Sequence, residues 1–224
     1  MGIRLRKYRV TYALNNYRSL FLSDLHLGSH NCKAEQLYNF LLCHNAQRIY
    51  LLGDIVEGHY VKAWPPFHDD VIKLLMWRSL MGTEIIFIPG NHDSIFRHHL
   101  GAFGNVKICM NYYHDCVDKS ILYVTHGDET DFLPNHLWLR FIILIERITK
   151  LPLWEVTRTL LSWVIRRHSD NFERKIRELG YPKTMCGHIH APKLSKGYMN
   201  SGDWVYHCTA IAEHFEGNFE LLKG

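Results

Sequence analysis

Five short polar clusters, each following a run of apolar residues, constrain this chain more than any other feature. The runs cover residues 19–22, 49–52, 84–89, 121–125 and 183–186. Short aliphatic or β-branched runs of this kind are typical of strands buried on both faces of a sheet. The clusters at their ends are SDLH at 23–26, GDIVE at 53–57, GNHD at 90–93, THGD at 125–128 and GHIH at 187–190. We therefore expect buried strands that end in polar side chains.

The spacing between these strands predicts the fold class. Helical stretches at 34–43 and 69–81 separate the early strands, which indicates an α/β protein. Later runs at 198–199, 204–210 and 215–222 are linked by turns without helices and predict an antiparallel portion. A length of 224 residues suits one domain over residues 1–224.

A helical insertion is expected at about residues 130–180. Its longest apolar run, residues 141–145, is far shorter than the ~20 residues needed to cross a bilayer. One face of it is apolar, with Arg158 beside it. Either this face packs on the core, or it forms a cap that binds acyl chains and rests on an anionic membrane. The apolar positions at helical spacing are Leu153, Val156, Leu160, Leu161 and Val164.

Composition favours a metal-binding protein with an anionic partner. The chain has sixteen histidines, and several of them lie in the polar clusters. The formal net charge is +4, with basic residues gathered near the start and around residues 166–177. The six cysteines show no CxxC spacing, and no signal segment is visible, so we expect a reduced, cytoplasmic protein without disulfides.

The clusters predict a site for two divalent cations. Carboxyl ends of strands in α/β proteins meet at one crevice, so the five clusters should converge. Aspartate, asparagine and histidine without thiolate suit manganese, iron or zinc, of which we favour manganese. Asp54 is expected to bridge, because one carboxylate can give an oxygen to each ion. The first ion would have Asp24, His26, Asp54 and His190, and the second would have Asp54, Asn91, His126 and His188.

The pairs Asp24/His26 and His188/His190 are expected to share a face. Two residues apart on an extended chain, side chains leave the same side of the strand. His92 lies next to a ligand and is expected to be catalytic, as a proton donor or a stabiliser of phosphate oxygens. Asp93 is expected to orient His92, with Glu57 as the alternative. Substrate binding is expected at Asn91 and His92 and, in the insertion, at Arg158, Leu160 and Val164.

The ordered set DLH, GDIVE, GNHD, TH and GHIH resembles the calcineurin-like metallophosphoesterase superfamily. This resemblance implies a four-layer α/β/β/α sandwich of two mixed sheets, with the insertion as a helical cap. The segments RSLFLSDLHLGS, YLLGDIVEG, FIPGNHD and NSGDWVYHCTAIAEHFEGNFELL are similar to the UDP-2,3-diacylglucosamine diphosphatase family. That resemblance implies a hydrolase of lipid A synthesis, peripheral at the membrane, that cleaves a nucleotide-linked glycolipid to UMP and 2,3-diacylglucosamine 1-phosphate. The best-known branch of that family carries arginine at the position of His92, so GNHD has the general superfamily form here.

Other functions remain open at this point. One is a soluble phosphomonoesterase or phosphodiesterase that acts on nucleotides or other phosphorylated small molecules with the same metals. Another is a scaffold that keeps the fold without catalysis, although every expected ligand position is filled. Nucleic acid is not expected as a partner, because no aromatic residues interleave with the basic ones in a recognisable motif. The sequence does not define an oligomeric state.

Overall fold

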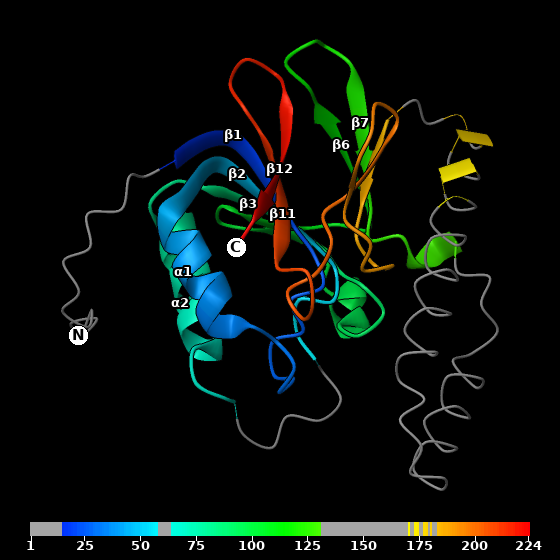
Figure 1. Ribbon diagram of the computed structural model, residues 1–224. Coiled ribbons are helices and arrows are strands. Elements are labelled where there is room, and N and C mark those ends of the chain that lie inside the picture. Colours follow the sequence, from blue (N-terminus) through cyan, green and yellow to red (C-terminus); the bar gives the residue numbers. More distant parts are fainter. Residues whose placement is uncertain are drawn as a thin grey trace, which may run out of the picture.

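Two mixed sheets form the body of the molecule (Figure 1). The computed structural model describes residues 15–57, 64–130 and 183–224, together with Asp170, Glu173, Arg174, Arg177, Glu178 and Gly180. The first sheet has seven strands in the order β12-β11-β1-β2-β3-β5-β4. The four central strands β1, β2, β3 and β5 are parallel to one another. The outer strands β4, β11 and β12 each pair antiparallel with their neighbours. Their bounds are β1 Asn15–Leu22, β2 His44–Leu52, β3 Glu84–Ile88, β4 Gly101–Phe103, β5 Val106–Ile108, β11 Thr209–Glu213 and β12 Phe219–Lys223.

The second sheet has five strands in the order β6-β7-β8-β10-β9. Its three central strands are parallel, and both edge strands are antiparallel to their neighbours. The carboxyl ends of β7 and β8 therefore lie at one end of this sheet. The bounds are β6 Tyr112–Asp115, β7 Ile121–Val124, β8 Thr184–Cys186, β9 Lys193–Leu194 and β10 Tyr198–Asn200.

Helices α1, Ala34–Cys43, and α2, His68–Leu80, cover the outer face of the first sheet (Figure 1). Their buried side chains, such as Leu37 and Leu75, pack on Leu20 and Ile49 of the sheet. Two short 3₁₀ turns, η1 Ser94–His98 and η2 Asp128–Thr130, follow polar clusters.

A second apolar cluster fills the space between the two sheets. Phe21 and Tyr50 of the first sheet pack with Val124 and Met185 of the second. Alternate residues of β1 thus face different layers, since Leu20 and Leu22 face the helices while Phe21 faces the second sheet. The described layers are helices, sheet and sheet, which confirms an α/β fold with two mixed sheets.

Polar side chains also join the sheets, at the end of the strands remote from the polar clusters. Arg18 Nη1 on β1 lies 2.7 and 2.8 Å from the two carboxylate oxygens of Glu213 on β11. His114 on β6 has Nε2 2.8 Å from Glu213 and Nδ1 2.7 Å from the hydroxyl of Tyr50. His114 and Glu213 are fully buried, so each depends on these partners for its hydrogen bonds.

Most of the predicted elements are present, with two corrections. The helix at 34–43 is α1, and α2 begins and ends one residue before the predicted 69–81. The strand predicted at 204–210 is wrong over residues 204–208, because Asp203 Oδ1 accepts the backbone N–H groups of Val205 and Tyr206 and folds the chain into a turn, and β11 begins only at Thr209. The strand predicted at 215–222 begins only at Phe219, after a turn closed by His214 and Asn218.

The predicted insertion at about 130–180 lies almost wholly outside the described residues, as do Arg158, Leu160 and Val164. No helix within the described residues is long and apolar enough to cross a membrane. All six cysteines are free thiols.

Replacing Leu20 by alanine should lower the free energy of unfolding by about 2–5 kcal/mol, because Leu20 is fully buried between β1 and the helices. Urea unfolding followed by circular dichroism measures this. The matched control is Leu80→Ala on α2, where the side chain is 77% exposed and the change should stay within about 0.5 kcal/mol. Equal losses in the two variants would contradict the described layering.

Candidate metal centre

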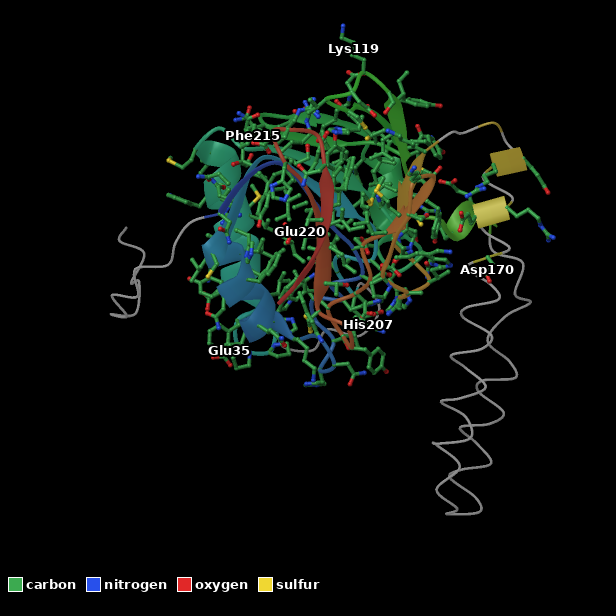
Figure 2. The ribbon with its side chains drawn as sticks, turned by 45° about the horizontal axis from the view of Figure 1, so that its top comes forward. Glu35, Lys119, Asp170, His207, Phe215 and Glu220 are labelled. Carbon is green, nitrogen blue, oxygen red and sulfur yellow. The ribbon has the colours of Figure 1, made fainter. Side chains whose placement is uncertain are left out.

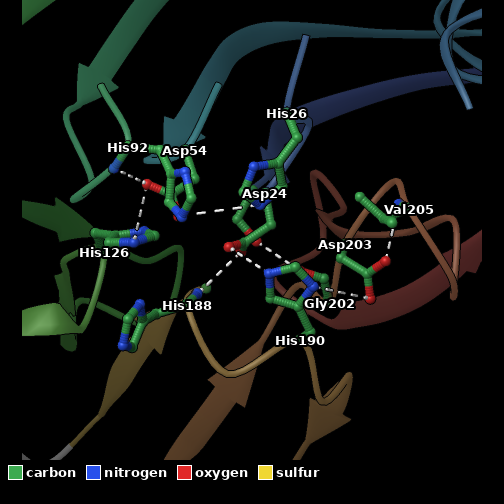
Figure 3. A network of polar contacts seen from close by, with 12 residues as sticks. Asp24, His26, Asp54, His92, His126, His188, His190, Gly202, Asp203 and Val205 are labelled. Atoms are coloured by element: carbon green, nitrogen blue, oxygen red, sulfur yellow. Dashed lines mark hydrogen bonds and ion pairs between the residues drawn. The ribbon is translucent and has the colours of Figure 1, made fainter. Parts of the chain in front are cut away.

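The polar clusters meet at the carboxyl ends of strands from both sheets (Figure 3). Asp24 and His26 follow β1, Asp54 follows β2, and Asn91 follows β3 in the first sheet. The second sheet contributes side chains that follow β7 and β8, so the site bridges the two sheets. These are His126, His188 and His190.

Asp24, His26 and His190 form the first group, with ligand atoms within 4.8 Å of one another. The Asp24 carboxylate is fully buried. Its Oδ2 accepts the backbone N–H of His188 at 2.9 Å, whereas its Oδ1 makes no hydrogen bond among the described residues. His190 Nε2 lies 3.1 Å from that oxygen. A buried carboxylate oxygen left in this state suits a cation.

Asp54, His126 and His188 form the second group, again within 4.8 Å of one another. Asp54 Oδ1 lies 3.6 Å from His126 Nε2, and Asp54 Oδ2 lies 4.0 Å from His26 Nε2. Each oxygen of this carboxylate thus faces a different group, as expected of a bridging ligand. Asn91 Oδ1 is 3.3 Å from His126 Nε2 and belongs to the second group.

Hydrogen bonds at the far ring nitrogens set the orientation and tautomer of two of the histidines. His126 Nδ1 lies 2.7 Å from the Leu52 carbonyl, which only accepts, so Nδ1 carries the proton. His26 Nδ1 lies 3.1 Å from Glu57 Oε2 in the same relation. Each ring then presents the lone pair of Nε2 to the site. Donor types and tautomers therefore fit two divalent cations of the manganese, iron or zinc class.

The extended backbone expected around these residues is wrong. Positive φ angles occur at Asp24 (52°), His26 (49°), Asp54 (52°), His188 (65°) and His190 (49°). This left-handed conformation costs roughly 1–3 kcal/mol for a residue with a side chain and clusters at functional sites. It also separates the second pair, because His188 belongs to the second group and His190 to the first.

Two glycines of the motifs leave room for the ligands. A Cβ on Gly90 would collide with Asp54 Oδ1 and with the ring of His126. A Cβ on Gly187 would collide with Ser23 and the Asp24 carboxylate. Both glycines are therefore required by close approach rather than by a left-handed backbone.

Asp24 and His190 of the first group shift each other's pKa. Burial acts to raise the pKa of Asp24, but the adjacent His190 outweighs it and holds that pKa well below its usual range. Burial acts to lower the pKa of His190, but Asp24 and then Asp203 raise it to about 9. Without a cation, His190 supplies the positive charge that Asp24 requires.

His92 is oriented by Glu57, not by Asp93. His92 Nδ1 lies 2.9 Å from Glu57 Oε1, while the other oxygen of Glu57 faces His26. Burial lowers the pKa of His92, but the hydrogen bond to Glu57 outweighs it and raises that pKa. Asp93 faces away and accepts the backbone N–H groups of Gly90 at 2.6 Å and Ile55 at 2.7 Å, which joins the GNHD and GDIVE loops.

Two further groups have the ligand types of a metal site. His92 joins His26 and Asp54 within 4.8 Å, so its distance alone does not separate a catalytic role from ligation. His114, Cys116 and Glu213 form the other group, at the remote end of the strands. There the guanidinium of Arg18 already lies between the Glu213 oxygens and balances their charge.

Asp203 was missed by sequence reasoning. It lies in the NSGDW segment and is fully buried, with Oδ2 3.9 Å from His190 Nδ1 (Figure 3). The available signal was an aspartate between Gly202 and Trp204 in a stretch that otherwise reads as a strand.

The chain belongs to the calcineurin-like phosphoesterase family. The family model matches residues 17–192, which span every predicted ligand. Together with the paired ligand groups, this makes the chain a metal-dependent hydrolase.

Curated relatives have one activity in common. The chain is similar to a UDP-2,3-diacylglucosamine hydrolase of Wigglesworthia glossinidia brevipalpis, at 26% identity over 79% of this chain and 80% of that protein. It is similar to a UDP-2,3-diacylglucosamine hydrolase of Aromatoleum aromaticum, at 23% identity over 78% of this chain and 80% of that protein.

Solved structures resemble the chain more remotely. A protein of unknown function from Aquifex aeolicus has a TM-score of 0.42 at 13% identity, covering 84% of this chain and 90% of that one. The nuclease MPE of Pseudomonas putida has a TM-score of 0.40 at 12% identity, covering 92% of this chain and 88% of that one.

Binding of Mn²⁺ should release a proton from His190, because the pKa of that residue is about 9 in the metal-free protein. Apparent affinity should rise about tenfold per pH unit between about pH 7 and pH 8.5 through this group alone, and level off near its pKa. Anaerobic calorimetry in two buffers of different ionisation enthalpy counts the protons. A pH-independent affinity would exclude His190 from the ligand set, and His190→Gln serves as the control that removes the slope.

Proposed function

We propose that this chain hydrolyses the diphosphate of UDP-2,3-diacylglucosamine, giving UMP and 2,3-diacylglucosamine 1-phosphate for lipid A synthesis. The observation that carries the proposal is the activity of the two curated relatives, matched over about 80% of their length, together with two ligand groups that each face one oxygen of Asp54. Hydrolysis of a diphosphate requires positive charge near the phosphoryl oxygens, and two cations bound at this site would supply that charge.

Asp24, His26, Asp54, Asn91, His126, His188 and His190 are the proposed ligands of two divalent cations, with manganese favoured. Bound there, the cations supply Lewis acidity to the phosphoryl group and a nucleophilic water at neutral pH. Asp54 keeps the two groups at a fixed separation, because each of its oxygens faces one of them. Asn91 is exposed at the rim and is proposed to contact substrate as well as cation.

His92 is the proposed acid catalyst. Its side chain is 39% exposed, so the ring reaches the space where substrate would lie. Glu57 Oε1 accepts a hydrogen bond from Nδ1–H and favours the protonated ring, whose Nε2–H can then donate to a phosphate oxygen or to the leaving group. Asp93 supports catalysis indirectly, by holding the loop that carries Asn91 and His92 against the loop that carries Asp54.

The insertion is proposed to complete the substrate site. A diacyl substrate needs an apolar groove, and the apolar face with Leu160, Val164 and Arg158 offers one at the sequence level. Its basic residues suit peripheral contact with an anionic membrane surface.

The alternative function is hydrolysis of soluble phosphate esters by the same centre. It is favoured by His92, which stands where the best-known branch of the diphosphatase family carries arginine, and by relatives of only 26% and 23% identity.

Substrate choice is tested by steady-state hydrolysis with Mn²⁺. The proposal requires kcat/KM for UDP-2,3-diacylglucosamine to exceed that for bis(4-nitrophenyl) phosphate by roughly 10²-fold or more, because specificity rests on contacts beyond the phosphates. UDP-N-acetylglucosamine, which lacks the two acyl chains, is the matched comparator. Equal rates on all three would favour the alternative, and an Asp54→Ala preparation checks for contaminating enzymes.

His92→Ala should lower kcat by about 10²–10⁴ while both Mn²⁺ ions remain bound. The readouts are single-turnover kinetics and the bound metal per chain. Loss of one ion from the variant would show that His92 is a ligand, as its proximity to His26 and Asp54 also permits. Glu57→Gln is the companion variant, because it keeps the side-chain volume and removes the charge behind His92.

A further inference from the structure

The segment Asn200–Trp204, which begins at the last residue of β10, supports both loops of the first ligand group. Its backbone N–H at Trp204 donates to the Asp24 carbonyl at 3.1 Å. Its Gly202 carbonyl accepts the Ser23 hydroxyl at 2.8 Å. On the other side, Asn200 Nδ2 donates to the Gly187 carbonyl at 2.6 Å. One buried segment thus fixes the positions of the DLH and GHIH loops.

Asp203 is the only charged residue of this segment and is fully buried. Its Oδ1 accepts the N–H groups of Val205 at 2.8 Å and Tyr206 at 2.5 Å. Its Oδ2 lies 2.5 Å from Nδ1 of His207 and 3.9 Å from Nδ1 of His190. The two oxygens therefore differ in role, because one closes the turn and the other faces two imidazoles.

His190 has its two ring nitrogens between two carboxylates. Nε2 faces Asp24 Oδ1 at 3.1 Å, and Nδ1 faces Asp203 Oδ2 (Figure 3). A histidine that binds a cation through Nε2 keeps its proton on Nδ1, and a carboxylate behind that N–H fixes the ring and raises its basicity. In the described residues, Glu57 has this place behind His26 and the Leu52 carbonyl has it behind His126.

We propose that Asp203 is a positioning residue that holds His190 ready for the first cation and so sets the affinity of that ion. This inference rests on the two-cation centre proposed above and adds a residue outside the predicted ligand set. Asp203 acts through His190, so it affects the first ion and leaves the second, held by Asp54, Asn91, His126 and His188, unchanged.

Asp203→Asn separates this role from that of closing the turn. Asparagine keeps an oxygen for the N–H groups of Val205 and Tyr206 but puts an uncharged amide group in place of the carboxylate oxygen that faces His190 at 3.9 Å. Anaerobic Mn²⁺ titration, followed by calorimetry and by the exchange-coupled paramagnetic resonance signal of a Mn²⁺ pair, should show one of the two ions bound about 10–100-fold more weakly. The other ion should be unaffected.

His207→Ala is the matched control. His207 is the other imidazole on Oδ2, lies at the surface with 46% of its side chain exposed, and is labelled in Figure 2. Its removal should leave both affinities within about twofold, because Oδ2 still faces His190. In a His190→Ala background, Asp203→Asn should add no further loss, since the residue through which it acts is gone.

Unchanged binding of both ions to the Asp203→Asn protein overturns the proposal, and so does equal weakening of both. A wild-type protein that binds no Mn²⁺ overturns the metal centre itself, and the proposal with it. Nitrogen-15 spectra of Zn²⁺-loaded wild type, with His190→Gln for assignment, give a test that does not depend on folding of the variant. His190 must bind through Nε2 with a proton on Nδ1; binding through Nδ1 overturns the proposal.

Discussion

Parallel pairing of β1 with β2 is the constraint on which the site depends. The register runs from Asn15 opposite His44 to Leu22 opposite Leu51, and the hydrogen bonds continue past the strand ends. The N–H of Asp24 donates to the Gly53 carbonyl, and that of His26 to the Asp54 carbonyl. These bonds hold the ligand-bearing loops together in a left-handed conformation that is unfavourable on its own. The pairing of the two strands therefore stabilises the loop conformation that places the ligand side chains.

Sequence patterns predicted the buried segments of the fold but missed the polar strand ends and turns, which depend on backbone hydrogen bonds. Helix α1 was predicted with its bounds, because its apolar spacing is clear. The polar first residues of β1 and β2 were missed, since only the later parts of these strands are buried. The strand predicted across Trp204 failed because one carboxylate, that of Asp203, folds the chain by accepting successive N–H groups.

The sequence predicted which residues form the candidate site better than it predicted which partner each side chain faces. Every expected ligand lies in the described site, because strand ends of one sheet edge must meet. Which carboxylate faces His92 was not predictable, since Asp93 is its neighbour in sequence while Glu57 lies on the loop after another strand, and only the path of the two loops decides between them. The role of Asp203 was not predictable for a similar reason: its position after Gly202 indicates a turn, but only the folded turn decides which oxygen accepts the N–H groups of Val205 and Tyr206 and which faces the imidazoles.

The two sheets are joined by polar contacts at both ends, but of different kinds. At one end, the carboxylate of Glu213 is paired with the guanidinium of Arg18 and lies within hydrogen-bond distance of His114, so its charge is balanced within the protein. At the other end, the side chains that face each other from the two sheets are the proposed metal ligands, and the proposed cations would link them. At this end the sheets are already joined by the hydrogen bond from the His188 N–H to Asp24 Oδ2, so the proposed cations would strengthen a contact that exists without them, and metal binding would stabilise the packing of the two sheets as well as supply the chemistry.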